Sequence, residues 1–165
     1  MEVPAAIHVP LIVKVLSFDR QLRVRAGRAL VVAVAYQGGN RASVTIKDDI
    51  VQLLDAERES IDGLTITAVA IDLDREELDA GLRARHPTVL YVTPLRGVDV
   101  TRIAAAARAA RVTTVATVPR DVSRGLALGV GLLADRPRLL VNLTAARLEG
   151  ADFSAELLKL AQVIP

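Results

Sequence analysis

The sequence of 165 residues contains no cysteine. Without thiols the protein can form no disulfide, no thiolate metal site and no cysteine nucleophile. Redox sensing through cysteine is excluded for the same reason.

Aromatic residues are also scarce, at 2%, although hydrophobic residues make up 52% of the chain. The core must therefore consist of Val, Leu, Ile and Ala, a composition typical of helices packed against a largely buried sheet. The aromatic platforms that stack single-stranded bases are missing. Because 21 basic side chains are nearly balanced by 19 acidic ones, for a net charge of +2, we expect no nucleic-acid partner.

No apolar run reaches the roughly 18 residues of a membrane-spanning helix, so we expect no direct membrane insertion. Residues 1–6 show no basic region followed by an apolar core, the pattern of a signal peptide. Two alternatives stay open. The protein is cytoplasmic if Met1 is native, or periplasmic if Met1 was added to a chain whose signal peptide had been removed.

The spacing of apolar residues predicts the order of helices and strands. Pro10 fits only the first turn of a helix, so the first helix is expected to start near Val9. Asp19 and Arg20, together with residues 23–27, are predicted to be a solvated connection. Asp74 is predicted to cap the helix after the second strand. We predict strands at residues 28–36, 64–71, 88–92 and 112–118, and helices at 9–18, 41–58, 74–84 and 99–110.

The end of the chain has a different pattern. Two apolar runs, at residues 126–133 and 138–143, flank a polar turn at Asp135 and predict a β-hairpin. Two helices are expected to follow, and the second carries an apolar stripe that is typical of core. This stripe consists of Phe153, Leu157, Leu158, Leu160 and Ala161.

Together these patterns predict one fold. Alternating strands and helices favour a parallel sheet covered on both faces. We predict a single three-layer α/β domain over residues 1–165, with a mixed, mainly parallel sheet, helices on both faces, a C-terminal β-hairpin and closing helices.

Two connections at the carboxyl ends of predicted strands are candidates for a ligand-binding site, because open α/β sheets bind ligands at this edge. The first holds Gly38, Gly39, Asn40 and Ser43, where amide groups and a helix start could meet an anion. The alternative interpretation is a turn in which Asn40 caps the helix. The second connection holds Thr93 and Arg96. The alternative interpretation of Arg96 is an ordinary surface arginine beside a helix start. Thr117, which lies at the end of the fourth predicted strand, is expected to lie at the same rim.

Catalytic and metal-binding patterns are not found. A receiver domain would need acidic residues where Gln37 and Thr93 stand. His8 and His86 belong to no ligand cluster, so no metal site and no cofactor are predicted. Acidic pairs such as Asp48 and Asp49 are interpreted as solvated helix faces, and no Gly-x-Ser-x-Gly elbow is present. We expect a protein that is not an enzyme.

Residues 136–150, RPRLLVNLTAARLEG, and residues 153–164, FSAELLKLAQVI, carry a resemblance to a known family. The segments resemble the C-terminal motif of the YfiR/HmsC-like proteins, a strand followed by two short helices. Residues 12–18 and 28–36 resemble the first helix and first strand of that family. The chain differs in lacking the family's disulfide cysteines and in having Leu140 where an acidic residue is common.

The resemblance implies a periplasmic α/β regulator that binds and restrains a membrane signalling partner. The expected partner is the periplasmic domain of a diguanylate cyclase, which produces cyclic-di-GMP, or of a sensor kinase. An alternative interpretation of the apolar stripe on the last helix assigns part of it to a homodimer contact. The second hypothesis is a stand-alone small-molecule-binding protein that resembles one lobe of a periplasmic binding protein, with its site at the rim of Gly38, Asn40, Ser43, Thr93 and Arg96.

Overall fold

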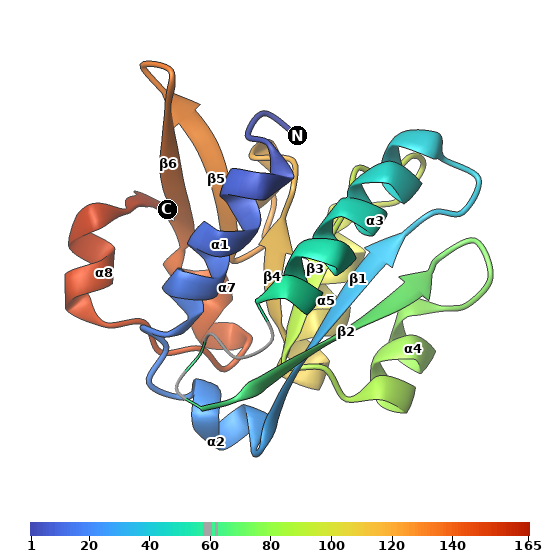
Figure 1. Ribbon diagram of the computed structural model, residues 1–165, viewed down its shortest axis with the longest axis horizontal. Coiled ribbons are helices and arrows are strands. Elements are labelled where there is room, and N and C mark those ends of the chain that lie inside the picture. Colours follow the sequence, from blue (N-terminus) through green and yellow to red (C-terminus); the bar gives the residue numbers. More distant parts are fainter. Residues whose placement is uncertain (58–60, 62) are drawn as a thin grey trace.

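A single seven-stranded sheet runs through the computed structural model, which describes residues 1–57, 61 and 63–165 (Figure 1). The strand order is β2-β1-β3-β4-β5-β6-β7, and neighbouring strands are parallel except for the antiparallel pair β5–β6. The predicted mixed, mainly parallel α/β fold is therefore confirmed. The strands are β1 (Ala29–Tyr36), β2 (Thr65–Asp72), β3 (Val89–Val92), β4 (Thr113–Ala116), β5 (Leu128–Leu133), β6 (Arg136–Asn142) and β7 (Gln162–Ile164).

Helices cover both faces of this sheet. Helices α1 (Ala5–Leu16) and α3 (Arg41–Ala56) pack on one face, and α4 (Leu78–Arg85) and α5 (Val100–Ala110) pack on the other (Figure 1). Each face has its own buried cluster, built mainly from Val, Leu, Ile and Ala, as the scarcity of aromatics predicts. The shorter helices are α2 (Leu22–Ala26), α6 (Arg120–Ser123), α7 (Leu143–Leu148) and α8 (Ala155–Leu160).

The predicted hairpin is formed by β5 and β6. Its two-residue turn, Ala134 and Asp135, has positive φ at both positions, 49° and 61°. This is the geometry of a type I′ turn, whose twist matches that of the flanking strands. The polar turn between two apolar runs was therefore a sufficient signal for the hairpin.

The first helix begins earlier than predicted. It starts at Ala5, so Pro10 lies inside it rather than in its first turn. Pro10 cannot donate to the carbonyl of Ala6, but Ala6 is exposed and water can satisfy that carbonyl. Burial of Val9, Ile12 and other apolar residues of this helix outweighs the lost hydrogen bond.

Two further helix boundaries differ from the predictions. The helix after β2 begins at Leu78, and Asp74 does not cap it. Helix α3 ends at Ala56 with Glu57 as its cap, whereas the predicted end at Arg58 lies outside the described residues.

The end of the chain was predicted only in part. Helix α8 stops at Leu160, and the last residues form β7, which extends the sheet next to β6. Leu157 is buried, as expected, but Leu160 is 72% exposed, so the predicted stripe was wrong at that position. The new strand offers the backbone of β6 parallel hydrogen bonds that a longer helix could not supply.

Candidate functional site

The strand order creates a topological switch point at β1. Strands β2 and β3 lie on opposite sides of β1, so the connections that leave the carboxyl ends of β1 and β3 diverge to opposite faces of the sheet. In open α/β sheets the crevice at such a point is where ligands bind. Gly38, Gly39, Asn40 and Ser43 follow β1, and Thr93 and Arg96 follow β3. The structure thus brings together six of the seven predicted site residues; Thr117 follows β4, one strand further along.

The hydroxyl groups at this switch point belong to a chain of hydrogen bonds that begins and ends at backbone groups of the protein. The amide of Gln37 donates to Ser43 Oγ at 2.9 Å, and the Ser43 and Thr93 hydroxyls are 2.6 Å apart. Thr93 Oγ1 donates to the carbonyl of Ala35 at 2.9 Å. Because the exposed fractions of Ser43 and Thr93 are 0% and 1%, these hydroxyls join strands and helix rather than facing a ligand. The hydroxyl of Thr117 likewise donates to the carbonyl of Val92, at 2.8 Å.

The glycine amides are occupied by carboxylates of the protein itself. Gly38 donates to Asp72 Oδ1 at 3.0 Å, and Gly39 donates to Asp74 Oδ2 at 2.7 Å. A Cβ on Gly38 would lie only 2.5 Å from Asp72 Oδ2, so the absence of a side chain permits this close approach. An external anion would have to displace these aspartates.

Asn40 and Gln37 hold the two connections together. Asn40 caps α3 by accepting from the amide of Ser43 at 3.5 Å, as one sequence interpretation predicted, and its Nδ2 donates to the carbonyl of Pro94 at 3.4 Å. The side chain of Gln37 pairs with the backbone of Arg96 through two hydrogen bonds of 2.8 Å. The role of Gln37 was missed, because an amide beside a glycine turn carries no local signal for a partner 59 residues away.

What stays open at the rim is a shallow depression of about 740 Å³ beside α3. Arg41 and Arg96 are exposed there, and no salt bridge of either is found in the described part of the chain. The depression therefore offers two guanidinium groups to an anionic group. Its lining is Gly39, Asn40, Arg41, Ala42, Thr45, Ile46 and Arg96.

A second depression of about 580 Å³ lies between α4 and α5, on the other face of the sheet. Its floor is apolar and its rim is mostly acidic. The Ala-rich helix predicted at residues 99–110 supplies one wall, as Ala105, Ala106 and Ala109. The opposite wall and ends are Leu73, Glu76, Glu77, Leu78, Asp79, Val98, Arg102 and Ile103.

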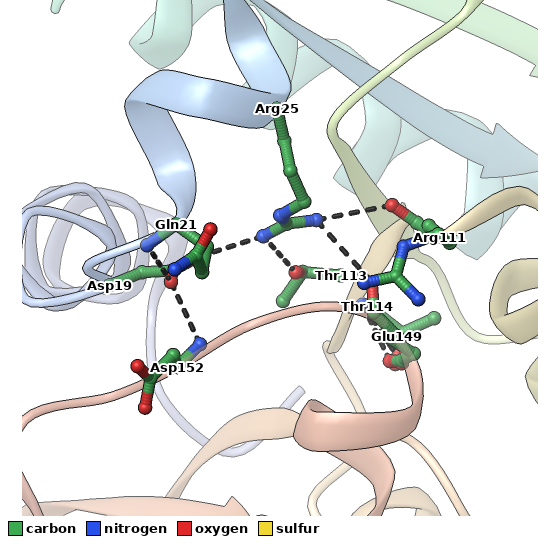
Figure 2. Close-up of polar contacts among 8 residues, drawn as sticks. All are labelled: Asp19, Gln21, Arg25, Arg111, Thr113, Thr114, Glu149 and Asp152. Atoms are coloured by element: carbon green, nitrogen blue, oxygen red, sulfur yellow. Dashed lines mark hydrogen bonds and ion pairs between the residues drawn. The ribbon is translucent and has the colours of Figure 1, made fainter.

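At the amino-terminal ends of the central strands the protein buries charged groups (Figure 2). Arg25 donates to Asp19 Oδ2 at 2.7 Å and to Thr113 Oγ1 at 2.9 Å. The Asp19 side chain is fully buried, and its other oxygen accepts the amides of Gln21 and Asp152. The prediction of a solvated connection holds for Arg20, Arg23, Val24 and Gly27, which are exposed, but is wrong for Asp19 and Arg25, because these two side chains fold back onto the start of β4.

Glu149 is the second buried charge of this network. It is 0% exposed, and its Oε1 accepts the amide of Thr114 at 3.0 Å and the hydroxyl of Thr114 at 2.6 Å. Burial raises the pKa of Glu149 from its usual 4.5 to about 7, although the hydrogen bonds from Thr114 and the charges of Arg108 and Arg25 oppose the increase.

His8 is buried between α1 and the sheet. Its Nδ1 lies 3.2 Å from the Tyr91 hydroxyl and its Nε2 lies 3.3 Å from the carbonyl of Ala116. These partners assign the proton to Nε2, since a carbonyl can only accept. Burial lowers the pKa of His8 from 6.5 to about 4, although the bond to Ala116 raises it. His8 is thus a neutral link between three elements, and in the described residues no group of three His, Cys, Asp or Glu is placed to hold a metal ion.

The C-terminal motif has a structural explanation in these contacts. Asn142 ends β6, caps α7 through the amide of Ala145 at 3.0 Å, and donates to the carbonyl of Val122. Glu149, at the end of α7, anchors this helix to β4, and Gly150 then takes a φ of 94° to turn the chain. Ser154 caps α8. The motif therefore encodes the closure of the domain.

Comparison with solved structures finds this fold in proteins of low sequence identity. A substrate-binding protein with adhesive properties from Clostridium difficile, in its ligand-free open structure, matches with a TM-score of 0.58 and 15% identity, over 87% of this chain and 57% of that one. The ABC domain in complex with L-Trp from Streptococcus pneumonia matches with a TM-score of 0.60 and 12% identity, over 92% and 60% of the two chains. A conserved domain protein from Vibrio cholerae matches with a TM-score of 0.62 and 16% identity, over 98% and 60%.

The chain spans about three fifths of the length of these solved structures. The sheet, its switch point and these similarities define the class of fold: an open, mainly parallel α/β domain that shares its fold with a substrate-binding protein. Comparison with curated proteins found no match.

The chain belongs to the YfiR/HmsC-like family, whose sequence profile matches residues 39–162. The match confirms the resemblance inferred from the C-terminal motif. It does not include residues 12–18 and 28–36, on which the rest of the resemblance was based. Of the described helices, none is long and apolar enough to cross a membrane.

Proposed function

We propose that the protein is a non-enzymatic periplasmic regulator that binds and restrains a membrane signalling protein, either a diguanylate cyclase or a sensor kinase. The observation that carries the proposal is the family match over residues 39–162. The periplasmic location and the cyclic-di-GMP pathway enter the proposal with the family.

The geometry of the switch point argues against turnover. The hydroxyls of Ser43 and Thr93 and the amides of Gly38 and Gly39 are already hydrogen-bonded within the protein. Catalysis would require a titratable pair that converges on a reacting atom. The three groups with strongly shifted pKa, His8, Tyr91 and Glu149, are all buried, and Glu149 is bonded to Thr114 rather than to the pair formed by His8 and Tyr91.

The depression between α4 and α5 offers a surface for such a partner. Its apolar floor and the acidic side chains of Glu77 and Asp79 suit a partner segment with apolar and basic side chains, whereas Glu76 is already paired with Arg85. Binding there would bias the partner between its two signalling states by the difference in affinity for them.

The test is co-purification with the periplasmic domains of the diguanylate cyclases and sensor kinases encoded in the same genome. We expect a complex, and we expect Ala105→Arg, on the exposed wall of the depression, to abolish it. The matched control is Ala110→Arg, also exposed on α5 but outside the depression. If wild-type protein forms no complex, with or without periplasmic extract as a source of ligand, the proposal is wrong.

The alternative function is a small-molecule-binding protein, favoured by one observation. Arg41 and Arg96 present exposed guanidinium groups in the depression at the switch point. A structural relative with this fold was solved with L-Trp, and a carboxylate is the kind of group two arginines bind. At a ligand concentration of about 100 times Kd the protein would be stabilised by about 2.7 kcal/mol. A thermal-shift screen of carboxylates and phosphates measures this, with Arg96→Ala as the variant that loses the response.

A further inference from the structure

The hairpin of β5 and β6 extends beyond the strands on either side of it. Strand β4 pairs with β5 only at Leu128 and Gly129, and β7 pairs with β6 only from Leu140 to Asn142. The hairpin itself continues to Leu133 and Arg136, and in Figure 1 its tip projects from the body of the protein. Among the described residues its last part is thus a two-stranded ribbon with no strand on its outer edges, an arrangement that is only marginally stable in water.

The tip of this ribbon is apolar on both of its faces. Residues 132–137 are all exposed, and Leu132 and Leu133 are 47% and 57% exposed. Leu132 lies opposite Pro137 and Leu133 lies opposite Arg136, so each face of the ribbon carries one leucine. Because the two leucines point in opposite directions, neither core cluster of the domain can cover both, and a flat protein surface could cover only one.

Basic side chains border the apolar tip on one face. Arg136 and Arg138 of β6 lie on the same face as Leu133 of β5. Arg120 follows Pro119, whose Cβ would lie 3.7 Å from a Cβ on Gly131 of that face. No salt bridge of these three arginines is found in the part of the chain that the structure describes. Asp135 is the single acidic residue of the sequence from 128 to 142. The tip is therefore both apolar and positively charged.

We propose that this hairpin tip rests on the surface of an anionic phospholipid bilayer. Leu132 and Leu133 enter the boundary between headgroups and acyl chains, and Arg136 and Arg138 bind lipid phosphates. A fluid bilayer can surround leucines that point in opposite directions, and apolar contact combined with basic side chains is how proteins bind membranes peripherally. The expectation of no direct membrane insertion concerned spanning helices, and this contact spans nothing.

The backbone of the ribbon limits how deep the tip can reach. The amides and carbonyls on its outer edges have no partner strand, and unsatisfied backbone groups are costly in hydrocarbon. The outer edges must therefore stay among the hydrated headgroups, so only the two leucine side chains meet the acyl chains. The arginines then lie at the level of the phosphates.

The first test uses the absence of tryptophan from the sequence. A tryptophan introduced at the tip reports on the tip alone. In Leu133→Trp we expect the fluorescence maximum to shift to shorter wavelength with vesicles of equal amounts of phosphatidylglycerol and phosphatidylcholine, because the indole leaves water. The matched control is Leu148→Trp, at a leucine of α7 that is 51% exposed. No shift in Leu133→Trp, or an equal shift in the control, would overturn the proposal.

The second test keeps the natural tip, because tryptophan itself favours the membrane interface. Wild-type protein is floated with the same vesicles. We expect the combined changes Leu132→Asp and Leu133→Asp to weaken binding about tenfold. Each of Arg136→Ala and Arg138→Ala should weaken it about fivefold. The control is Arg83→Ala, an exposed arginine of α4, which should bind like wild type. Wild-type protein that stays behind, or tip variants that bind as well as the control, would contradict the proposal.

These tests use the full chain and vesicles without a protein partner, so their failure leaves the proposed regulatory function untouched. A shift in Leu133→Trp that appears only with the periplasmic domain of a signalling protein, and not with vesicles, would assign the tip to a protein interface. That result would overturn the lipid contact.

Discussion

The two ends of the same sheet satisfy their polar groups in different ways. At the carboxyl ends of β1 and β3, glycine amides bond to Asp72 and Asp74, and buried hydroxyls bond to each other, across 34 to 50 residues of sequence. At the amino-terminal end of β4, Arg25, Asp19 and Glu149 are held in a buried network that joins segments more than 100 residues apart. The glycine-rich connection looked functional in the sequence and is largely self-contained, whereas the connection that looked solvated contains an interior ion pair.

The two ends of the sheet differ in how much the free energy of unfolding would fall if one polar group were removed. Removing a hydroxyl at the carboxyl end leaves a neutral donor or acceptor unpaired, which costs about 1–3 kcal/mol of stability. Removing one partner of a buried ion pair leaves a charge without compensation and costs about 3–5 kcal/mol. The amino-terminal end should therefore dominate stability, and the rim should be more tolerant of change.

The largest effect is expected for Arg25→Ala. The variant leaves the fully buried Asp19 carboxylate without its cation and should lower the free energy of unfolding by about 3–5 kcal/mol. Urea denaturation measures the loss. Arg96→Ala, an exposed arginine at the other end of the sheet, should change it by less than about 0.5 kcal/mol. Similar losses in both variants would remove the contrast between the two ends.

The second largest effect concerns how the free energy of unfolding depends on pH. In the wild type, two groups with opposite contributions largely cancel this dependence. The folded pKa of Glu149, about 7, lies above its usual 4.5, so its contribution to stability is present below pH 4.5 and is lost as the pH rises through 7. The folded pKa of His8, about 4, lies below 6.5, so its contribution is present above pH 6.5 and is lost as the pH falls through 4. Each amounts to about 3 kcal/mol, and the two oppose each other.

Replacing one group should reveal the other. In Glu149→Gln the free energy of unfolding should rise by about 3 kcal/mol between pH 4 and pH 6.5, because the contribution of His8 is no longer opposed by that of Glu149. In His8→Asn it should fall as the pH rises from 4.5 to 7. Chemical denaturation at several pH values measures both profiles. Parallel profiles in the two variants would show that these groups do not control the pH dependence.

The smallest effect is expected at the rim. Ser43→Ala removes the acceptor of the Gln37 amide and should cost about 1–3 kcal/mol. Thr45→Ala, an exposed hydroxyl two residues along the same helix, is the control and should be nearly neutral. Denaturation of both proteins compares them directly. A cost above that of Arg25→Ala would reverse the order of the two ends.

Much of the fold was predictable because it depends on local patterns. Apolar runs gave β1 to β4 within about two residues, and the turn at Ala134 and Asp135 gave the hairpin. Of the candidate site, the grouping of Gly38 to Ser43 with Thr93 and Arg96 followed from the rule that carboxyl ends of parallel strands meet at one edge. The bonds that occupy these groups could not be predicted, since Asp72 and Asp74 belong to another strand connection.

The sequence by itself determined the elements, the class of fold and the family, because periodicity, turn residues and a motif are properties of neighbouring residues. Only the tertiary structure decided which polar groups are buried and paired. Asp19 and Glu149 have the sequence surroundings of surface acids, and they become interior groups because distant backbone amides and Arg25 converge on them. The strand β7 and the protrusion of the β5–β6 hairpin were decided in the same way, since an unpaired backbone is defined only once its neighbours in the sheet are known.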